Sequence, residues 1–154
     1  MQYFANSDRG RVRPYHQDRT LTLPLAGGGL LAAVFDGMGG HADGDWDLLR
    51  VAKKEVMEEC GLPELTEVSP DIFSLEILSV AGHEKKGRYL SSHLHLNVTY
   101  LFEADPAQPL RIKPDENSAV GWVKVEDIPQ KTNEAWFRER IYSKLCEKTA
   151  QRTT

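Results

Sequence analysis

The chain has 154 residues, of which 40% are hydrophobic and 27% charged, and its net charge is −4. This length suits one compact domain, residues 1–154, and the negative charge argues against a nucleic-acid-binding surface, which needs a basic patch. No apolar run approaches the ~18 residues of a membrane span, and no basic-then-apolar leader is present. We therefore expect a cytoplasmic protein without a membrane segment, whose two cysteines are reduced thiols.

Two strands are expected near the start of the chain. Residues 19–23 alternate polar and apolar side chains, and residues 29–35 form a short apolar run. The glycines of residues 26–29 supply the turn between them. A loop rich in glycine and aspartate follows, from residue 36 to residue 45.

A helix is predicted from Asp47 to Cys60. Asp45 or Asp47 can cap its amino end, and Gly61 stands where a left-handed carboxyl cap is favoured. Apolar residues at three- and four-residue spacing mark one face as buried. These residues are Leu48, Leu49, Ala52 and Val56.

Long strands are expected at residues 72–81 and 88–102, around a polar turn at residues 82–87. The second strand alternates apolar and polar side chains, which predicts one buried face and one polar face. The apolar set is Leu94, Leu96, Val98 and Tyr100, and the polar set is His93, His95, Asn97 and Thr99.

A further strand, residues 119–125, and a final amphipathic helix, residues 133–147, complete the prediction. Strands arrive in runs rather than alternating with helices, so we expect an α+β fold with a mixed sheet flanked by helices. The inward side chains of the last helix are expected to be Trp136, Phe137, Ile141 and Leu145.

Three glutamates of the first helix are the main candidates for chemistry. Glu55, Glu58 and Glu59 are spaced i, i+3 and i+4, so they share one side of the helix. Like charges at this spacing repel each other and destabilise the helix. A bound divalent cation such as Mg²⁺ makes the same arrangement favourable. The alternative is a solvated acidic face whose repulsion is softened by Lys53 and Lys54.

The surrounding segment, residues 40–62, resembles the Nudix box, G-x5-E-x7-R-E-U-x-E-E-x-G-U, where U is aliphatic. Two places depart from the pattern. Lys54 stands where the family has arginine, so the charge is kept but the bidentate fork is lost. Trp46 stands where the family has a glutamate. The matching residues are Gly40, Glu55, Val56, Glu58, Glu59, Gly61 and Leu62.

The resemblance implies a Nudix-like α/β/α sandwich that hydrolyses nucleoside-diphosphate-linked substrates with Mg²⁺ or Mn²⁺. It makes Glu55, Glu58 and Glu59 the metal ligands and catalytic residues, with Glu59 also a candidate to orient or deprotonate water. A further family acid before a later strand matches Glu116, which is equally well explained as a turn residue.

Four other residues are assigned to the substrate side of the site: Gly40, Lys54, His93 and His95. The two histidines share a strand face and could bind a metal or a base. Two histidines without a third ligand more often line a strand or a pocket. Cys60 is expected to pack in the core, because no base is placed beside it.

The front of the chain carries a second resemblance. Residues 7–18 and 31–41 resemble the opening of metal-dependent Ser/Thr phosphatases of the PPM type, with Asp18 and Asp36 at family positions and His16 replacing an asparagine. Our hypothesis is a chimera, natural or engineered, in which a phosphatase-like segment, residues 1–40, replaces the first Nudix strands. Chance similarity is the alternative.

These observations favour a metal-dependent pyrophosphohydrolase acting on a small nucleotide or nucleotide-sugar substrate. A catalytically impaired chimeric Nudix-fold scaffold or binding protein is the alternative, and residual phosphomonoesterase activity of the front segment is a third hypothesis. We expect a monomer or a homodimer, since an exposed hairpin edge can pair with a second copy.

Overall fold

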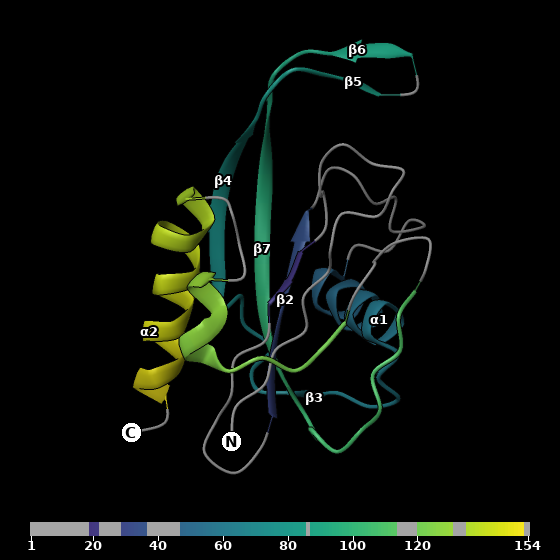
Figure 1. The fold of residues 1–154 in the computed structure, drawn as a ribbon, viewed down its shortest axis with the longest axis vertical. Coiled ribbons are helices and arrows are strands. Elements are labelled where there is room, and N and C mark those ends of the chain that lie inside the picture. Colours follow the sequence, from purple (N-terminus) through teal and green to yellow (C-terminus); the bar gives the residue numbers. More distant parts are fainter. Residues whose placement is uncertain are drawn as a thin grey trace.

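The computed structural model of the protein describes residues 19–21, 29–36, 47–85, 87–113, 120–130 and 135–152. Its sheet lies between two helices, α1 (Leu48–Cys60) and α2 (Ser143–Arg152), as Figure 1 shows. The fold class is therefore the expected α+β sandwich. Among the described residues, no helix is both long and apolar enough to cross a membrane.

The twelve-residue strand β7 (His93–Ala104) organises the sheet. It pairs along one edge with β2 (Gly29–Asp36), and β1 (Arg19–Leu21) continues the sheet beyond β2. Along its other edge it pairs with β4 (Ser74–Val80) and the short β3 (Thr66–Glu67). Every one of these pairs is antiparallel. The two strands predicted at the front of the chain are thereby confirmed.

Each face of β7 is buried in its own core. Successive strand side chains point to opposite faces, so residues 98, 100, 102 and 104 face α1, where they pack with Val51, Ala52 and Val56. Leu101 faces the other way and packs with Ile141 and Leu145. One helix therefore covers each face of the sheet, with α1 on one face and α2 on the other.

The predicted limits of α1 are confirmed by its capping contacts. The side chain of Asp47 accepts a hydrogen bond from the backbone N of Arg50 at 3.1 Å. At the other end Gly61 adopts φ 66°, the left-handed conformation. The backbone N of Arg111 donates to the carbonyl of Cys60 at 2.9 Å, which holds a later loop against this helix end.

The strand predicted at residues 88–102 is divided in the structure. Its first part is β6 (Arg88–Leu90), which pairs with β5 (His83–Lys85) in a separate two-stranded sheet. The segment predicted as a turn, residues 82–87, therefore contains a strand, and Gly87 lies in a turn. This β5–β6 hairpin projects from one end of the main sheet in Figure 1.

The predicted burial pattern of β7 is confirmed at Val98 and Tyr100, but it is wrong at two polar and two apolar positions. Asn97 and Thr99 are buried, because α2 and its preceding turn cover that face of the sheet. Leu94 is 62% exposed and Leu96 45%, because the core with α1 begins only at Val98. The alternation is real, but each face is covered over only part of its length.

The strand predicted at residues 119–125 is not found, and residues 120–124 belong to neither strand nor helix. Their apolar side chains serve both cores instead: Val120 and Trp122 pack on the α1 side, whereas Val123 and Val125 pack on the other. A 3₁₀ helix, η1 (Val125–Gln130), follows.

The final helix is α-helical at residues 135–136, passes through a π-helical segment, η2 (Phe137–Tyr142), and continues as α2 to residue 152, beyond the predicted end at 147. The predicted inward position of Trp136 is wrong, since this side chain is 55% exposed. A π turn holds an extra residue, so side chains before it are rotated out of the register of a regular α-helix. Ile141 and Leu145 are buried as predicted.

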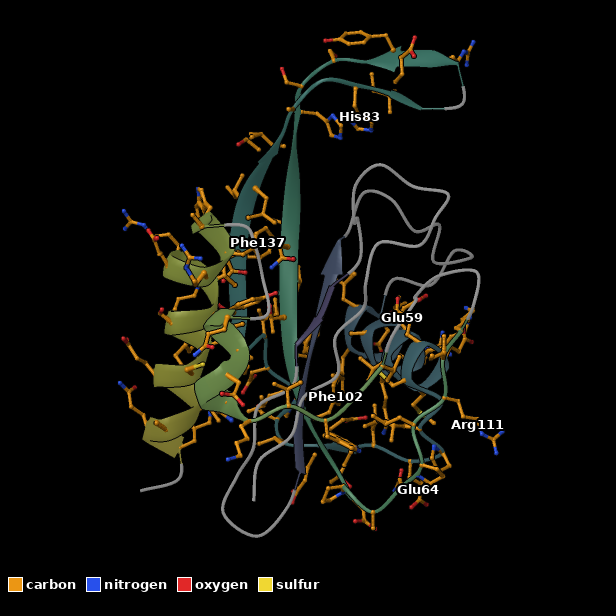
Figure 2. All side chains as sticks on the ribbon, viewed as in Figure 1. Glu59, Glu64, His83, Phe102, Arg111 and Phe137 are labelled. Carbon is orange, nitrogen blue, oxygen red and sulfur yellow. The ribbon has the colours of Figure 1, made fainter. Side chains whose placement is uncertain are left out.

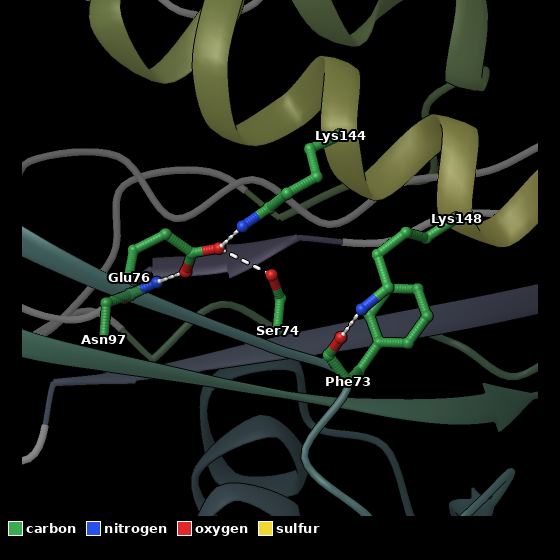
Figure 3. Close-up of polar contacts among 6 residues, drawn as sticks. All are labelled: Phe73, Ser74, Glu76, Asn97, Lys144 and Lys148. Atoms are coloured by element: carbon green, nitrogen blue, oxygen red, sulfur yellow. Dashed lines mark hydrogen bonds and ion pairs between the residues drawn. The ribbon is translucent and has the colours of Figure 1, made fainter.

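A buried polar network fixes α2 to the sheet (Figure 3). The carboxylate of Glu76 on β4 accepts hydrogen bonds from Ser74 Oγ at 2.6 Å and from Asn97 Nδ2 at 2.7 Å. Lys144 Nζ on α2 completes the set with an ion pair to the same carboxylate. One turn further along, Lys148 donates to the carbonyl oxygen of Phe73. A buried carboxylate is costly unless it is paired in this way.

Candidate functional site

The acidic side of α1 places its three glutamates in three environments. Glu59 is buried, with 5% of its surface exposed, because it follows Val56 around the helix and lies at the edge of the α1 core. Glu55, one turn earlier on the same side, is half-buried, and Glu58 is exposed. The three carboxylates therefore differ in burial, and Glu58 is the most exposed of them.

Glu58 is paired with two lysines. Its carboxylate lies 3.8 Å from Lys54 Nζ, one turn away on α1, and 3.7 Å from Lys113 Nζ in the loop after β7. Exposed pairs of this length contribute little to stability. Of the two lysines expected to soften the acidic face, only Lys54 does so here, because Lys53 binds Glu67 on β3 at 3.0 Å.

The donor set of α1 suits a hard divalent cation. Mg²⁺ takes oxygen ligands and is often held by one or two carboxylates together with substrate phosphates. Within the described residues, no three His, Cys, Asp or Glu side chains already converge on a point that could hold a metal ion. Glu58 would have to turn away from Lys54 and Lys113, and the length and exposure of those pairs make that turn inexpensive. The residue types on α1 thus suit a divalent metal, and its three carboxylates are not gathered around one point in this structure.

The thiol beside these carboxylates is inert. Burial and the negative charge of Glu59 together raise the pKa of Cys60 to about 12, so it remains a protonated thiol at neutral pH. Burial likewise raises the pKa of Cys146. Both cysteines are free thiols, and Cys60 packs in the core as expected.

Several residues proposed from the sequence lie outside the part of the chain that the structure describes. These are His16, Asp18, Gly40, Trp46 and Glu116. For Asp36 and His95 the structure describes the backbone, which pairs with Asn97 and Leu78 respectively.

The structure brings together two groups that local sequence patterns did not connect. Lys113 reaches Glu58 from 55 positions along the chain, and no local pattern predicts such a contact. His93, which the sequence paired with His95, has its ring 6.2 Å from the ring of His83. His93 begins β7, whereas α1 packs on the strand from Val98 onward, so this pair belongs to the other end of the sheet.

Comparison with known families matches residues 22–145 to the NUDIX domain. The chain belongs to the Nudix family. This match covers α1, the whole sheet from β2 onward and the start of α2. No curated protein matches the sequence significantly.

Nudix domains are hydrolases of nucleoside diphosphate derivatives, small nucleotide-type molecules, and they generally use divalent cations. The match starts at residue 22 and so includes β2, which the phosphatase resemblance assigned to another family. Nothing in the comparison supports a phosphatase-derived segment. Of the two resemblances in the sequence, the Nudix one is confirmed.

Proposed function

We propose that this Nudix domain is a Mg²⁺- or Mn²⁺-dependent pyrophosphohydrolase with Glu55, Glu58 and Glu59 as its metal ligands. The observation that supports this proposal most directly is the acidic side of α1, a capped helix inside a matched Nudix domain. A nucleoside diphosphate linked to a second group is the proposed substrate class, and the fold leaves the identity of that group open.

Each glutamate has a distinct part in the proposed reaction. A bound divalent metal supplies charge neutralisation at the diphosphate and lowers the pKa of a bound water. The Glu59 side chain is buried, which suits the task of orienting that water or accepting its proton. Glu58 would turn from its two lysines to hold the metal, and the positive charges of Lys54 and Lys113 would then be available to the phosphate oxygens.

The remaining assignments of the sequence stay proposals. Gly40, His93 and His95 are assigned to the substrate side, and Glu116 to an additional metal ligand. Gly40 and Glu116 lie outside the residues that the structure describes.

A Nudix-fold binding protein without turnover is the second candidate. The observation that favours it is Lys54, which pairs with Glu58 through a single ammonium at 3.8 Å where the family motif has an arginine. An ammonium lacks the planar fork that holds a carboxylate by two hydrogen bonds. The chimera hypothesis adds a third possibility, phosphomonoesterase activity that depends on Asp36.

One assay panel separates these candidates. Release of product from nucleoside triphosphates, ADP-ribose and dinucleoside polyphosphates is measured with Mg²⁺ or Mn²⁺, beside p-nitrophenyl phosphate. We expect Glu59→Gln to lower kcat on the best diphosphate substrate by about 100-fold or more, the scale of loss when a group acting in acid–base chemistry is removed.

Glu64→Gln is the matched control, because Glu64 is exposed just beyond the end of α1 and lies apart from Glu59 in Figure 2. Its activity should equal that of the wild type. A folded protein inert on the whole panel would support the binding-protein candidate. Activity on p-nitrophenyl phosphate that requires Asp36 rather than Glu59 would contradict both.

Restoring the family arginine gives a test in the opposite direction. Lys54→Arg should raise kcat/KM by about threefold to tenfold, because a guanidinium can hold a glutamate carboxylate in one orientation through two hydrogen bonds. The side chain of Lys54 is 62% exposed, so arginine fits without displacing core residues. Steady-state kinetics at saturating Mg²⁺ measure the effect. Unchanged or lower kcat/KM would show that position 54 does not limit turnover.

A further inference from the structure

The strand β4 forms an edge of the main sheet. It pairs with β7 along one side, and none of the described strands pairs with its other side. In Figure 1 it runs beside β7 for most of its length. Its seven residues make it the main strand of this edge, since β3 has only two. An edge strand presents backbone N–H and C=O groups to which another strand can bind.

The hydrogen bonds along this edge of β7 show which side of β4 is open. The carbonyl oxygen of Thr99 on β7 accepts from the backbone N of Phe73 at 2.8 Å. The carbonyl oxygen of Leu101 accepts from the backbone N of Val68 at 3.1 Å. Backbone groups alternate between the two edges of a strand, so the odd-numbered residues of β7 direct theirs toward β3 and β4. They lie opposite the even-numbered residues of β4, as Thr99 does with Ser74, and these therefore bond to β7.

The outward backbone groups of β4 are the alternate set, those of Leu75, Ile77 and Ser79. Within the part of the chain that the structure describes, no hydrogen bond joins these groups to another segment. The side chains of Leu75 and Ile77 are 52% and 64% exposed. Edge strands are commonly protected by lysine or proline, and β4 contains neither. Its one charged residue, Glu76, is paired with Lys144 on α2, so the edge is open to a second strand.

We propose that β4 pairs antiparallel with β4 of a second copy of this chain, around a twofold axis at Ile77. Ile77 is the middle residue of Ser74–Val80, so an axis there pairs the strand over its full length. Leu75 then lies opposite Ser79 of the second copy, and the outward groups exchange hydrogen bonds with one another. The interface uses the same patch on both copies and joins the two sheets into one. It does not depend on the hydrolase activity proposed above.

The side chains of β4 fit a second copy in this register. Ile77 would meet Ile77 of the second copy on the α1 face of the sheet. Leu96, exposed on the same face and opposite Ile77 on β7, extends this apolar row in both copies. On the other face Glu76 would lie opposite Leu78. An axis at Glu76 instead would set two carboxylates directly opposite each other, which is destabilising.

The length of β4 sets the expected strength of the dimer. Seven residues span about 23 Å. One strand pair with a single apolar row is a small interface, and interfaces that bury less than about 1,200 Å² are typically weak or transient. We therefore expect a reversible dimer whose population rises with protein concentration.

Sedimentation velocity of the untagged full chain, from low to high micromolar concentration, tests the proposal. We expect a monomer–dimer equilibrium in the wild type. Ile77→Lys should weaken association by about tenfold or more, because it sets two like charges at the axis. Ile112→Lys is the matched control, since Ile112 is 50% exposed in the loop after β7, and it should associate as the wild type does. A wild type that stays monomeric, or equal weakening by the two lysines, would overturn the proposal.

Disulfide trapping tests the register with two small, neutral substitutions. Opposed residues of a hydrogen-bonded antiparallel pair have Cα atoms about 5.5 Å apart, within the span that a disulfide bridges. Ile77→Cys should therefore form an intermolecular disulfide under mild oxidation. Leu75→Cys should not, because the two copies of position 75 would lie about 13 Å apart along the strands. Cross-linking that is equal in the two variants, or absent from both, would overturn the proposed pairing.

Discussion

At the scale of single residues, Cys60 shows how the acidic side of α1 affects its neighbours. The thiol is buried in the core and stands next to the Glu59 carboxylate, and both effects favour its neutral form. It is therefore a poor nucleophile, but it also makes the folded state sensitive to alkali. The unfolded chain can release this proton at a much lower pH than the folded chain can.

This difference predicts a pH dependence of stability. The pKa of Cys60 is raised from 9.0 to about 12 by folding, so its contribution to the free energy of unfolding is complete below pH 9 and is lost as the pH rises toward 12. Between pH 8 and pH 10 the wild type should lose about 1 kcal/mol more than Cys60→Ala. Urea unfolding under reducing conditions at both pH values measures this. Equal losses in the two proteins would show that the thiol ionises as easily folded as unfolded.

At the scale of elements, the end of α1 depends on two properties of one glycine. Gly61 has φ +66°, and a Cβ added there would lie 2.6 Å from the Cβ of Arg111. Arg111 cannot move away without losing the hydrogen bond that its backbone N donates to the carbonyl of Cys60. The end of the helix that carries the glutamates is thus locked to the loop containing Lys113.

Gly61→Ala should lower the free energy of unfolding by about 2–4 kcal/mol, combining the left-handed backbone penalty with the clash. Gly87→Ala is the matched control. Gly87 has φ +72°, but an added Cβ there meets no atom within 4 Å. It should cost only about 1 kcal/mol. Chemical denaturation compares the two, and equal costs would mean that Arg111 gives way.

The contact between α2 and the sheet depends on the charge of Lys144. In Lys144→Met the Glu76 carboxylate would keep Ser74 and Asn97 as donors but lose its counter-ion. We expect a loss of about 1–3 kcal/mol, less than for a fully buried pair because 40% of the lysine side chain is exposed. The double variant Glu76→Gln/Lys144→Met should recover part of this loss, since no buried charge is then left unpaired.

Lys53→Met is the control for Lys144→Met. It removes the exposed ion pair with Glu67, whose side chain is 41% exposed. The expected cost is below about 1 kcal/mol. Thermal or urea unfolding of the four proteins gives the comparison. A double variant less stable than Lys144→Met alone would contradict the assignment of Glu76 as the buried partner.

Local signals explain which elements and site residues could be predicted. The limits of α1 were predictable because Asp47 and Gly61 are caps that act within one turn, and the three glutamates share a side through helical spacing alone. The break between β6 and β7 was not predictable. Leu94 and Leu96 continue the alternating apolar pattern that includes Val98, but unlike Val98 they are exposed. Lys113 and His83 reach their partners only through the tertiary fold, so no pattern in the sequence marked them.

At the scale of the whole molecule, β7 joins the two cores. Phe102 and Leu101 are neighbours in sequence, but each is buried in a different core, one under α1 and one under α2. Loosening either helix therefore disturbs the same strand. We expect one cooperative unfolding transition for the described fold rather than separate steps for its two halves.

The position of β7 in the chain also matters while the protein is being made. Its partners β2, β3 and β4 all precede it in the chain. Ala33 on β2, for example, pairs with Tyr100 on β7 and cannot do so until β7 has been synthesised. A ribosome must therefore complete about two-thirds of the chain before the sheet can close. Until then the apolar side of α1 lacks the β7 side chains that complete its core, and this period of exposure favours chaperone binding or aggregation. Slower translation of the residues after β7 would give the sheet more time to form, and it would not prolong the period in which the apolar side of α1 is exposed.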